Sequence, residues 1–487
     1  MFRKPDNLKF FLNVGGKDLV EDLKNYDKIV RRQDKRFAPR KRTNLPWQSP
    51  GMVKQVIPYE RGVRFACDSG WVELQWIAVD CVRVRLRVQD AAFAAPFSYA
   101  VSKVDWPVVP FEIIDSEDAV EVFSASLTCR VDKHSFRLGF ERRVDRRLVC
   151  ADMGGIQWRD DGAVRLSLGL KAGETSYGMG ERAAGLNLRG KRLTLWNTDN
   201  PKYERYSDPL YYNVPLYLGV HNDIVHAIFW DNSSRGVVDI GAARPDELIF
   251  ESEWGELRYY LFAAQDVNTV LARYTELTGR IKLPPLWALG YQQSRFSYYP
   301  QKSVLELAVT LRHRGIPCDV IYLDMHYMDN FQTFTWNRER FPDLRRMVAD
   351  LHAGGFKVMA VLTPGIKADP EYRVYKSGVA HDVFVKYPDG TPVEGVAWPG
   401  VCHFPDFTNP TTRAWWGDQC HRILELGVDG LSNSMSEPAL LTPFDPTTLP
   451  DYGRHNQDGL GGDHLENHNV YGMLMGQSSS EALERHR

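Results

Sequence analysis

The hydrophobic pattern of this chain changes at Leu283-Pro284-Pro285, so the two sides of this point must fold differently. Between about residues 51 and 283, short runs alternate apolar and polar residues, most clearly from Val82 to Val88. Gly, Asp and Asn separate these runs. A period of two is typical of half-buried antiparallel strands. Residues 51–283 therefore predict a β-sandwich domain of the supersandwich type.

After Pro285, short apolar runs alternate with helical stretches, which is typical of parallel βα units. The expected strands are Leu286 to Tyr291, Val320 to Asp324, Val358 to Leu362 and Gly430 to Met435. Helices are expected over residues 303–314, 344–353 and 466–485, and residues 367–410, rich in Gly, Pro and aromatics, form an insertion after the third strand. A (β/α)8 TIM barrel needs eight strands and about 250 residues. Residues 284–487 hold four units, so they predict the first half of such a barrel.

Residues 1–50 form a basic N-terminal extension, with nine Lys and Arg among the nineteen residues from Lys24 to Arg42. A run of like charges is usually solvated, so a poorly ordered segment is expected. Contact with an anionic partner is the alternative interpretation of this run.

The rest of the composition excludes several classes of protein. A net charge of −2 gives no overall bias toward nucleic acid or a membrane surface. No stretch of about twenty apolar residues exists, so no transmembrane helix is expected. Charged residues interrupt Met1 to Val20, which argues against a signal peptide. The seven cysteines are scattered without paired spacing, which favours a reduced, cytoplasmic protein without structural zinc.

The segment from Asp429 to Pro438 stands at the end of the fourth expected strand and reads Asp-Gly-Leu-Ser-Asn-Ser-Met-Ser-Glu-Pro. It resembles the signature of glycoside hydrolase family 31, the α-glucosidase-like family, which reads Asp-Gly, aromatic, Trp, Asn, Asp, Met, Asn, Glu-Pro. In that family the Asp before Met is the nucleophile that forms a covalent glycosyl-enzyme. The matching residue here is Ser434.

The resemblance extends from about Trp47 to the C-terminus. Further segments that fall in the family's order are Tyr177 to Arg182, Leu195 to Asp199, Pro284 to Tyr291, Thr335-Trp336, Phe341-Pro342, Trp398 to Gly400, Phe404 to Pro410 and His468 to Gly472. Because these motifs are numerous and ordered, the resemblance does not depend on the signature alone.

The resemblance implies a site for an α-linked glucoside or oligosaccharide at the C-terminal ends of the barrel strands. Asp324 matches the Asp that grips the 4-hydroxyl of the nonreducing sugar. Trp398 matches an aromatic wall, and Asp199 matches a contact from a sandwich-domain loop. Met435, the Met of the signature, also belongs to the expected substrate-binding set.

Four positions depart from the usual family pattern. His326 stands where many members carry a second Asp, although His also occurs there. Thr363 replaces an Asp, which removes a negative group from the expected pocket. Ser432 replaces Trp and Ser436 replaces Asn beside the nucleophile position.

The substitution at Ser434 bears directly on activity. A retaining glycosidase needs an ionised carboxylate about 5 to 5.5 Å from a protonated acid. A serine hydroxyl is neutral at pH 7 and needs an adjacent base to become nucleophilic. The sequence around Ser434 shows no triad-like arrangement of a His and an acid that could supply this base. The family's general acid lies on a later strand, beyond Arg487. We therefore expect the chain to be inactive or severely impaired as a hydrolase.

Two alternatives remain open. The chain could be a noncatalytic carbohydrate-binding or interaction protein that uses the retained pocket. It could also be one half of a split enzyme, with a second chain that supplies the missing barrel half. An open reading frame downstream that encodes the acid-bearing segment would favour the split enzyme.

No metal or other cofactor is expected. His464 and His468 are four residues apart on a probable helix and could share a metal ion, but no third ligand is evident. The glycines lack the spacing of a phosphate-binding loop.

Overall fold

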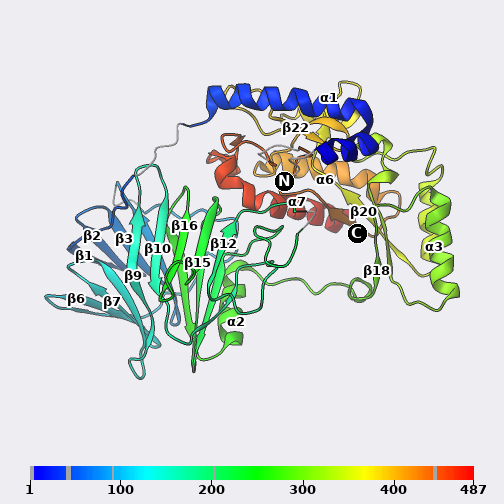
Figure 1. Cartoon of the computed structure of the whole chain (residues 1–487). Helices are drawn as coiled ribbons and strands as arrows, with labels where there is room; N and C mark the ends of the chain where they lie inside the picture. The colour runs from blue at the N-terminus through cyan, green and yellow to red at the C-terminus, as the bar shows by residue number, and fades with distance from the viewer. Residues whose placement is uncertain (1–4, 40–44, 90–92, 201–202, 443–446, 487) are drawn as a thin grey trace. The chain divides into compact units, whose positions relative to one another are not determined.

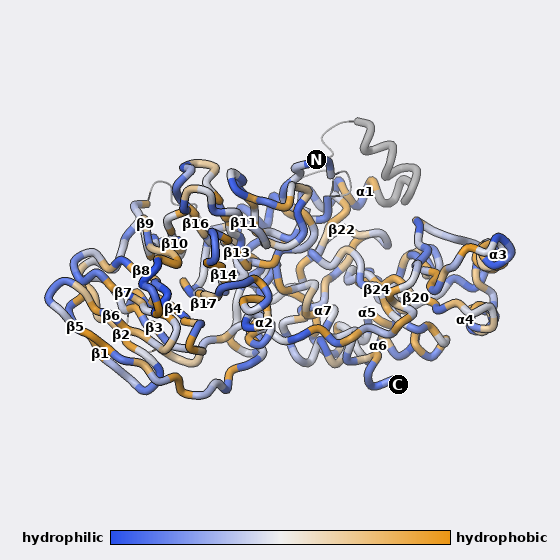
Figure 2. Tube along the Cα trace, turned by 90° about the horizontal axis from the view of Figure 1, so that it is seen from below, coloured by the Kyte–Doolittle hydropathy of each residue, from blue (hydrophilic) through white to orange (hydrophobic). Residues whose placement is uncertain are grey.

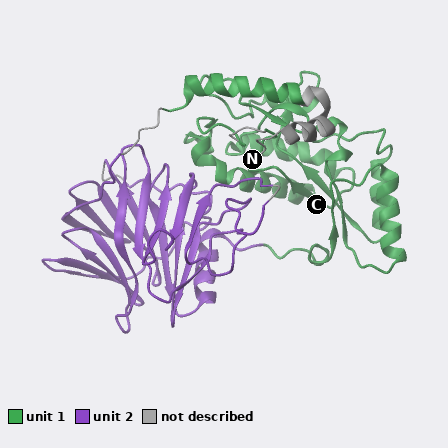
Figure 3. Cartoon of the chain, in the orientation of Figure 1, with its two compact units in different colours: residues 1–40, 282–487 green, residues 41–281 purple. Residues whose placement is uncertain are grey.

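The computed structural model describes residues 5–39, 45–89, 93–200, 203–442 and 447–486, with the side chains of the first helix described from Val20 onward. The chain divides into two compact units, which Figure 3 shows in different colours. One unit spans residues 41–281, close to the expected sandwich domain. The other combines residues 1–40 with residues 282–487.

The unit of residues 41–281 consists of two antiparallel sheets (Figure 1). The eight-stranded sheet has the order β1-β2-β3-β4-β17-β14-β13-β11, and the nine-stranded sheet has the order β12-β15-β16-β10-β9-β8-β7-β6-β5. The first sheet contains β1 (Val53–Tyr59), β2 (Gly62–Cys67), β3 (Trp71–Ala78), β4 (Cys81–Arg87), β11 (Thr175–Gly178), β13 (Leu216–His221), β14 (Ile224–Trp230) and β17 (Arg258–Ala264). The second contains β5 (Glu112–Asp115), β6 (Ala119–Phe123), β7 (Leu127–Asp132), β8 (Arg137–Arg142), β9 (Leu148–Trp158), β10 (Val164–Gly169), β12 (Lys191–Leu195), β15 (Gly236–Ile240) and β16 (Glu247–Ser252).

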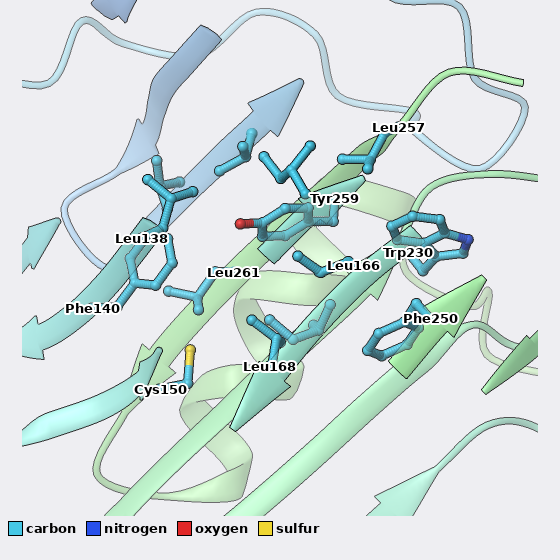
Figure 4. Close-up of a cluster of buried hydrophobic side chains, with 14 of the residues drawn as sticks. Leu138, Phe140, Cys150, Leu166, Leu168, Trp230, Phe250, Leu257, Tyr259 and Leu261 are labelled. Atoms are coloured by element: carbon cyan, nitrogen blue, oxygen red, sulfur yellow. The ribbon is translucent and has the colours of Figure 1, made fainter. Parts of the chain in front are cut away.

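The facing sides of the two sheets form one large apolar core. Trp230 of β14 stacks on Phe250 of β16 with ring centroids 5.7 Å apart (Figure 4). Tyr259 and Leu261 of β17 are also fully buried in this core. The structure therefore confirms the predicted β-sandwich. Helix α2 (Val267–Thr278) follows the last strand, and its N-cap Asp266 accepts the N–H of Thr269 at 2.9 Å.

One detail of the strand prediction was wrong. The run from Val82 to Val88 was expected to be half-buried, but from Cys81 to Leu86 every residue of β4 is buried. Its arginines tolerate burial because they pair with carboxylates: Arg85 lies 2.8 Å from Glu256 and 3.6 Å from Glu73. Paired and hydrogen-bonded charges can enter an interior that excludes single charges.

In the other unit, a parallel sheet has the strand order β18-β19-β20-β24. The strands are β18 (Gln292–Gln293), β19 (Val320–Leu323), β20 (Lys357–Leu362) and β24 (Gly430–Asn433), and the helices between and after them are α3 (Gln301–His313), α4 (Leu344–Ala353), α5 (Arg373–Ala380), α6 (Pro410–Leu424) and α7 (His464–His486). This arrangement confirms a partial TIM barrel. Among the described residues the sheet does not close, and β18 and β24 are its edges.

The first barrel strand lies later than predicted. Residues expected to be a strand, Leu286 to Tyr291, instead begin with the 3-10 helix η1 (Leu286–Leu289), and β18 begins at Gln292. Leu286 and Leu289 are 86% and 67% exposed. Apolar residues that face solvent mislead an assignment that depends on burial.

The expected insertion after the third strand contains the antiparallel sheet β21-β23-β22, with β21 (Ile366–Lys367), β22 (Glu394–Ala397) and β23 (Gly400–His403). Short elements complete this unit: η2 (Met325–Tyr327), η3 (Asp329–Phe331), η4 (Gln457–Gly459), β25 (Arg454–His455) and β26 (Gly462–Asp463).

The N-terminal segment differs from the poorly ordered extension expected from its charge. It forms helix α1 (Pro5–Phe37), which packs against the insertion near β22 (Figures 1 and 2). Val20, Leu23 and Tyr26 are buried there, whereas Lys24 and Lys28 remain exposed. The described basic residues from Lys24 to Arg36 thus belong to a packed helix, whereas Arg40, Lys41 and Arg42 lie outside the described residues. Within the part of the chain that the structure describes, no helix is long and apolar enough to cross a membrane.

Candidate functional site

Three of the predicted site residues directly follow the ends of neighbouring parallel strands. Asp324 follows β19, Thr363 follows β20, and Ser434 follows β24. The register aligns Leu323 of β19 with Ala360 and Asn433 of β24 with Leu362, and the Ser434 N–H donates to the Leu362 carbonyl at 2.8 Å. Since parallel strands end at one edge, the structure brings these residues together, as the sequence predicted.

Asp324 provides the carboxylate of this edge. It caps η2, and its Oδ1 accepts the N–H of Met325 at 2.7 Å. Burial raises the pKa of this carboxyl, and the Met325 hydrogen bond opposes that shift. A partly desolvated carboxylate is a strong acceptor for ligand hydroxyl groups.

An aromatic cluster stands next to this carboxylate. The Trp398 ring lies 5.7 Å from Phe296 and 6.0 Å from Phe331, and His326 lies 5.0 Å from Phe296 and 5.2 Å from Phe331. His326 also stacks on Tyr299 at 4.6 Å, with the rings only 2° from parallel. Predicted residues Trp398 and His326 therefore belong to one wall.

Sequence reasoning missed Phe296, Tyr299 and Phe331 as parts of this wall. A signal existed in the aromatic run after the first strand, where Phe296 and Tyr299 are separated by two residues. Phe296 and Tyr299 are 52% and 44% exposed, so part of each residue is accessible at this surface. Burial also lowers the pKa of His326, and nearby Arg340 adds to this effect, so the neutral imidazole is favoured.

Met435 connects the insertion to the end of β24. The Trp398 Nε1–H donates to its sulfur at 3.0 Å. The backbone of Met435 has a φ of 56°, a left-handed conformation that costs energy for a residue with a side chain. Among the described residues, no side chain forms a hydrogen bond with Ser434 Oγ.

A buried chain of imidazoles lies behind the signature. His455 Nδ1 lies 2.7 Å from Asp406, His455 Nε2 lies 3.0 Å from His464 Nδ1, and His464 Nε2 lies 3.1 Å from His468 Nδ1. If Asp406 is ionised and the rings are neutral, each ring must donate from Nδ1 toward Asp406. The burial of Asp406 would raise its pKa, but the contact with His455 and the other hydrogen bonds hold that pKa below its usual range.

Thr448 links this row of imidazoles to Pro438, the last residue of the signature. The Thr448 hydroxyl donates to the Pro438 carbonyl at 2.7 Å and lies 3.3 Å from His468 Nδ1. His464 Nε2 and His468 Nδ1 thus lie within hydrogen-bond distance of each other, at 3.1 Å. Among the described residues, no group of three His, Cys, Asp or Glu could hold a metal ion.

Asp429, the first residue of the signature, lies at the other end of β24 and supports the sheet. Its carboxylate accepts the Val358 N–H at 2.9 Å and lies 2.8 Å from Lys357 and 2.7 Å from His352. Burial opposes ionisation, but the hydrogen bonds from these groups, Lys357 foremost, hold the pKa of Asp429 below its usual range. This residue therefore joins two strands away from the candidate site.

Asp199 lies in the unit of residues 41–281 and is half-buried. Burial raises the pKa of its carboxyl, and a hydrogen bond with Tyr211 opposes that shift. Its predicted contact with a sugar stays a prediction.

Comparisons with known proteins agree with both units. The model of the "Glycosyl hydrolases family 31 TIM-barrel domain" matches residues 281–487. The model of the "Glycosyl hydrolase 31 N-terminal galactose mutarotase-like domain" matches residues 72–239. The first match spans the partial barrel, and the second lies within the sandwich unit.

Individual relatives point in the same direction. The chain is 38% identical to alpha-glucosidase 2 of Bacillus thermoamyloliquefaciens over 428 residues, which are 86% of this chain and 53% of the relative. It is 36% identical to an alpha-glucosidase of Saccharolobus solfataricus over 300 residues, 61% of this chain and 43% of the relative. A dextranase of Flavobacterium johnsoniae complexed with isomaltotriose superposes with a TM-score of 0.82 at 29% identity, over 90% of this chain and 53% of the dextranase. The chain thus spans about half the length of these relatives.

Proposed function

Because the chain belongs to glycoside hydrolase family 31 and its homologues are α-glucosidases, we propose that its strand-end site binds α-linked glucosides or oligosaccharides but hydrolyses them poorly or not at all. The observation that carries this proposal is Ser434 at the end of β24, in the signature position of the nucleophile. Binding and catalysis have different requirements at this site.

Catalysis needs a group that Ser434 does not provide. The double displacement of a retaining glycosidase passes through an ester between the anomeric carbon and a carboxylate. A neutral hydroxyl neither stabilises the oxocarbenium-like transition state by charge nor attacks without a base. The absence of a hydrogen-bonded base at Ser434 Oγ among the described residues supports the loss of this step. Thr363 at the neighbouring strand end cannot replace the charge either.

Sugar binding needs hydroxyl acceptors and an apolar face, and the site retains both kinds of group. Asp324 offers a partly desolvated carboxylate, and Trp398 offers an indole surface that Phe296 and Phe331 flank. Sugar rings present C–H groups on one face and hydroxyls at their rim, which suits such a combination. The isomaltotriose complex of the dextranase and the names of the α-glucosidases support α-linked glucosides as the ligand class.

Titration calorimetry with isomaltotriose and maltose tests the binding proposal. The native protein should bind, and Asp324→Ala should lose most of the affinity because charge-assisted hydrogen bonds to sugar hydroxyls disappear. Asp418→Ala is a matched control, since Asp418 lies on α6 and its side chain is 68% exposed. Equal affinity in the native protein and Asp324→Ala, or no binding in either, would reject the proposal.

A second candidate is one half of a split hydrolase. It is favoured by the open sheet, in which β18 and β24 each have one partner strand among the described residues. Coexpression with the second barrel half of the Bacillus thermoamyloliquefaciens enzyme provides a test. A stable complex would support this candidate, and activity would additionally require a carboxylate at position 434.

The cellular location remains a proposal as well. We propose a reducing cytoplasmic compartment, which is consistent with seven free cysteines, six of them buried. Fractionation of the native host with immunodetection would test it. Recovery outside the cytoplasm would refute it.

A further inference from the structure

Helix α1 contributes to the apolar core of the insertion. Val20, Leu23 and Tyr26 lie on one side of α1 and are only 7%, 2% and 4% exposed. They join a cluster with residues of β22, β23 and the segments around them, namely Val385, Tyr387, Val393, Val396, Ala397, Cys402, Phe404, Leu440, Leu449 and Tyr452. A helix that buries this face is fixed on its partner and does not behave as a solvated tail.

Polar and aromatic contacts fix the C-terminal end of α1 to the same region. The Tyr452 hydroxyl donates to Asp34 at 2.8 Å, and Arg36 lies 2.8 Å from Asp389. The ring of Phe37 stacks on Tyr387 at 6.2 Å with an interplanar angle of 16°. Together with the buried residues Val20, Leu23 and Tyr26, these contacts fix the C-terminal half of α1, from Val20 to Phe37, on the insertion.

The turn between β22 and β23 lies directly against α1. This turn runs from Ala397 through Trp398 to Gly400, whose φ is 105°. A Cβ on Gly400 would stand 2.9 Å from the Asp22 carboxylate of α1. The turn therefore lies beside the Asp22 side chain of α1, and its positive φ favours glycine at this position.

The same region also contacts the segment after the signature. The Leu441 N–H donates to the Val396 carbonyl of β22 at 2.8 Å, and Leu440 shares the cluster with Tyr26. Within the turn, the Trp398 Nε1–H donates to the sulfur of Met435 at 3.0 Å. A continuous set of contacts thus runs from α1 through β22 to the signature and to the segment that follows it.

We infer that α1 is a strap that holds the turn between β22 and β23 in place, so that Trp398 forms the wall of the candidate sugar site. Tyr26 and Leu23 are positioning residues in this arrangement: they pack against β22 and β23 and so hold Trp398, which is the residue that would contact the sugar. The inference rests on the proposed function as far as the sugar is concerned. Its structural part, the dependence of Trp398 on α1, does not require that a sugar binds.

Tyr26 offers a sharp pair of variants. Its hydroxyl is buried and has no hydrogen-bond partner among the described residues, so Tyr26→Phe should keep the packing and Tyr26→Ala should remove it. Lys28→Ala on the exposed side of the same helix is the control. The readout is fluorine NMR of the protein labelled with 5-fluorotryptophan, with the Trp398 resonance assigned from Trp398→Phe.

Tyr26→Ala should shift or broaden the Trp398 resonance and accelerate amide hydrogen exchange over residues 394–403, whereas Tyr26→Phe and Lys28→Ala should leave both unchanged. Affinity for isomaltotriose should fall about threefold to tenfold in Tyr26→Ala, as expected when one aromatic contact is misplaced. If Tyr26→Ala does not fold, the double variant Asp34→Ala and Arg36→Ala decides, because it removes the two polar contacts without a cavity. An unchanged Trp398 resonance and exchange in the folded variant would overturn the strap. A native protein that binds no sugar but shows the NMR response would instead reject only the proposed function.

Discussion

The indole N–H of Trp398 donates to the sulfur of Met435 at 3.0 Å, although the two residues are 37 positions apart in the sequence. Trp398 comes from the insertion after β20, and Met435 follows β24, so the contact joins an inserted hairpin to the end of a barrel strand. Met435 holds this place in a left-handed backbone conformation. The wall of the candidate site therefore depends on the insertion as much as on the sheet.

Substitution of Trp398 should weaken sugar binding according to the size of the remaining ring. We expect Trp398→Ala to cost about 0.5 to 1.5 kcal/mol of binding free energy and Trp398→Phe to retain part of it. Met435→Leu removes the sulfur acceptor but keeps the volume, so its effect should be smaller. Calorimetry with isomaltotriose measures all three, and an affinity that is indifferent to Trp398→Ala would exclude this residue from the site.

Hydrolysis of aryl α-glucosides by a protein of the printed sequence should be indistinguishable from buffer. Loss of the nucleophile in another covalent hydrolase lowers kcat by about six orders of magnitude, and Ser434 stands in that position here. Alpha-glucosidase 2 of Bacillus thermoamyloliquefaciens serves as the positive control. Measurable hydrolysis that disappears in Ser434→Ala would contradict the prediction.

Ser434→Asp alone should not restore activity in this assay. The resemblance places the general acid on a barrel strand later than β24, and among the described residues the parallel sheet has no strand after β24 in the sequence. The carboxylate pair would therefore remain incomplete. Robust turnover by Ser434→Asp would show that another residue of this chain supplies the acid.

Several of these features follow from short sequence patterns, and others do not. Asp324 and Ser434 could be placed because the family resemblance assigns both to motif positions at the ends of expected strands, and parallel strand ends meet at one edge. The contact of Trp398 with Met435 could not, because it depends on how the long insertion folds back. The sequence did not predict that α1 packs on the rest of the chain. Its apolar face is short, and charged residues surround Val20, Leu23 and Tyr26 in the sequence. The first strand was predicted too early because Leu286 and Leu289 are apolar but exposed, so an apolar run there did not indicate a buried strand.

The unit that contains β23 should lose stability in mild acid because of His403. Burial beside Tyr375 and Phe384 lowers the pKa of His403 from 6.5 to about 4. The unfolded chain therefore binds a proton that the folded chain does not between pH 6.5 and 4, so this contribution is present above pH 6.5 and is lost as the pH falls through that window. His403→Leu should reduce the change in the urea midpoint between pH 7 and pH 5. The same change in both proteins would assign the acid sensitivity to other groups.

The sandwich unit should show the opposite trend because of Asp152. Burial raises the pKa of Asp152 from 3.8 to about 7, although the N–H of Leu138 and the charge of Arg137 oppose this shift. The folded state thus retains a proton that the unfolded state releases, and stability from this group falls as the pH rises from about 4 to 7. Asp152→Asn keeps an oxygen for the Leu138 N–H, at 2.9 Å from Oδ2 in the native protein, and should flatten the dependence. Urea unfolding of residues 41–281 between pH 4 and 7 measures how the free energy of unfolding depends on pH. The same pH dependence in the variant and the native protein would show that Asp152 does not cause it.

Residues 282–487 should be the weaker unit when a protein of the printed sequence is expressed alone. Among the described residues, β18 and β24 are open edges, and unpaired edges of a parallel sheet invite self-association. The segment that leads to β18 adds apolar surface, because Ile281, Leu283 and Leu286 are 94%, 92% and 86% exposed. We expect aggregation, self-association or dependence on a partner that supplies further strands. Limited proteolysis with mass spectrometry should give early cuts after about Leu283, while a fragment near residues 50–283 persists. A monodisperse monomer in which both units resist protease equally would show that the edges of the sheet are covered in a way that β18 and β24 do not reveal.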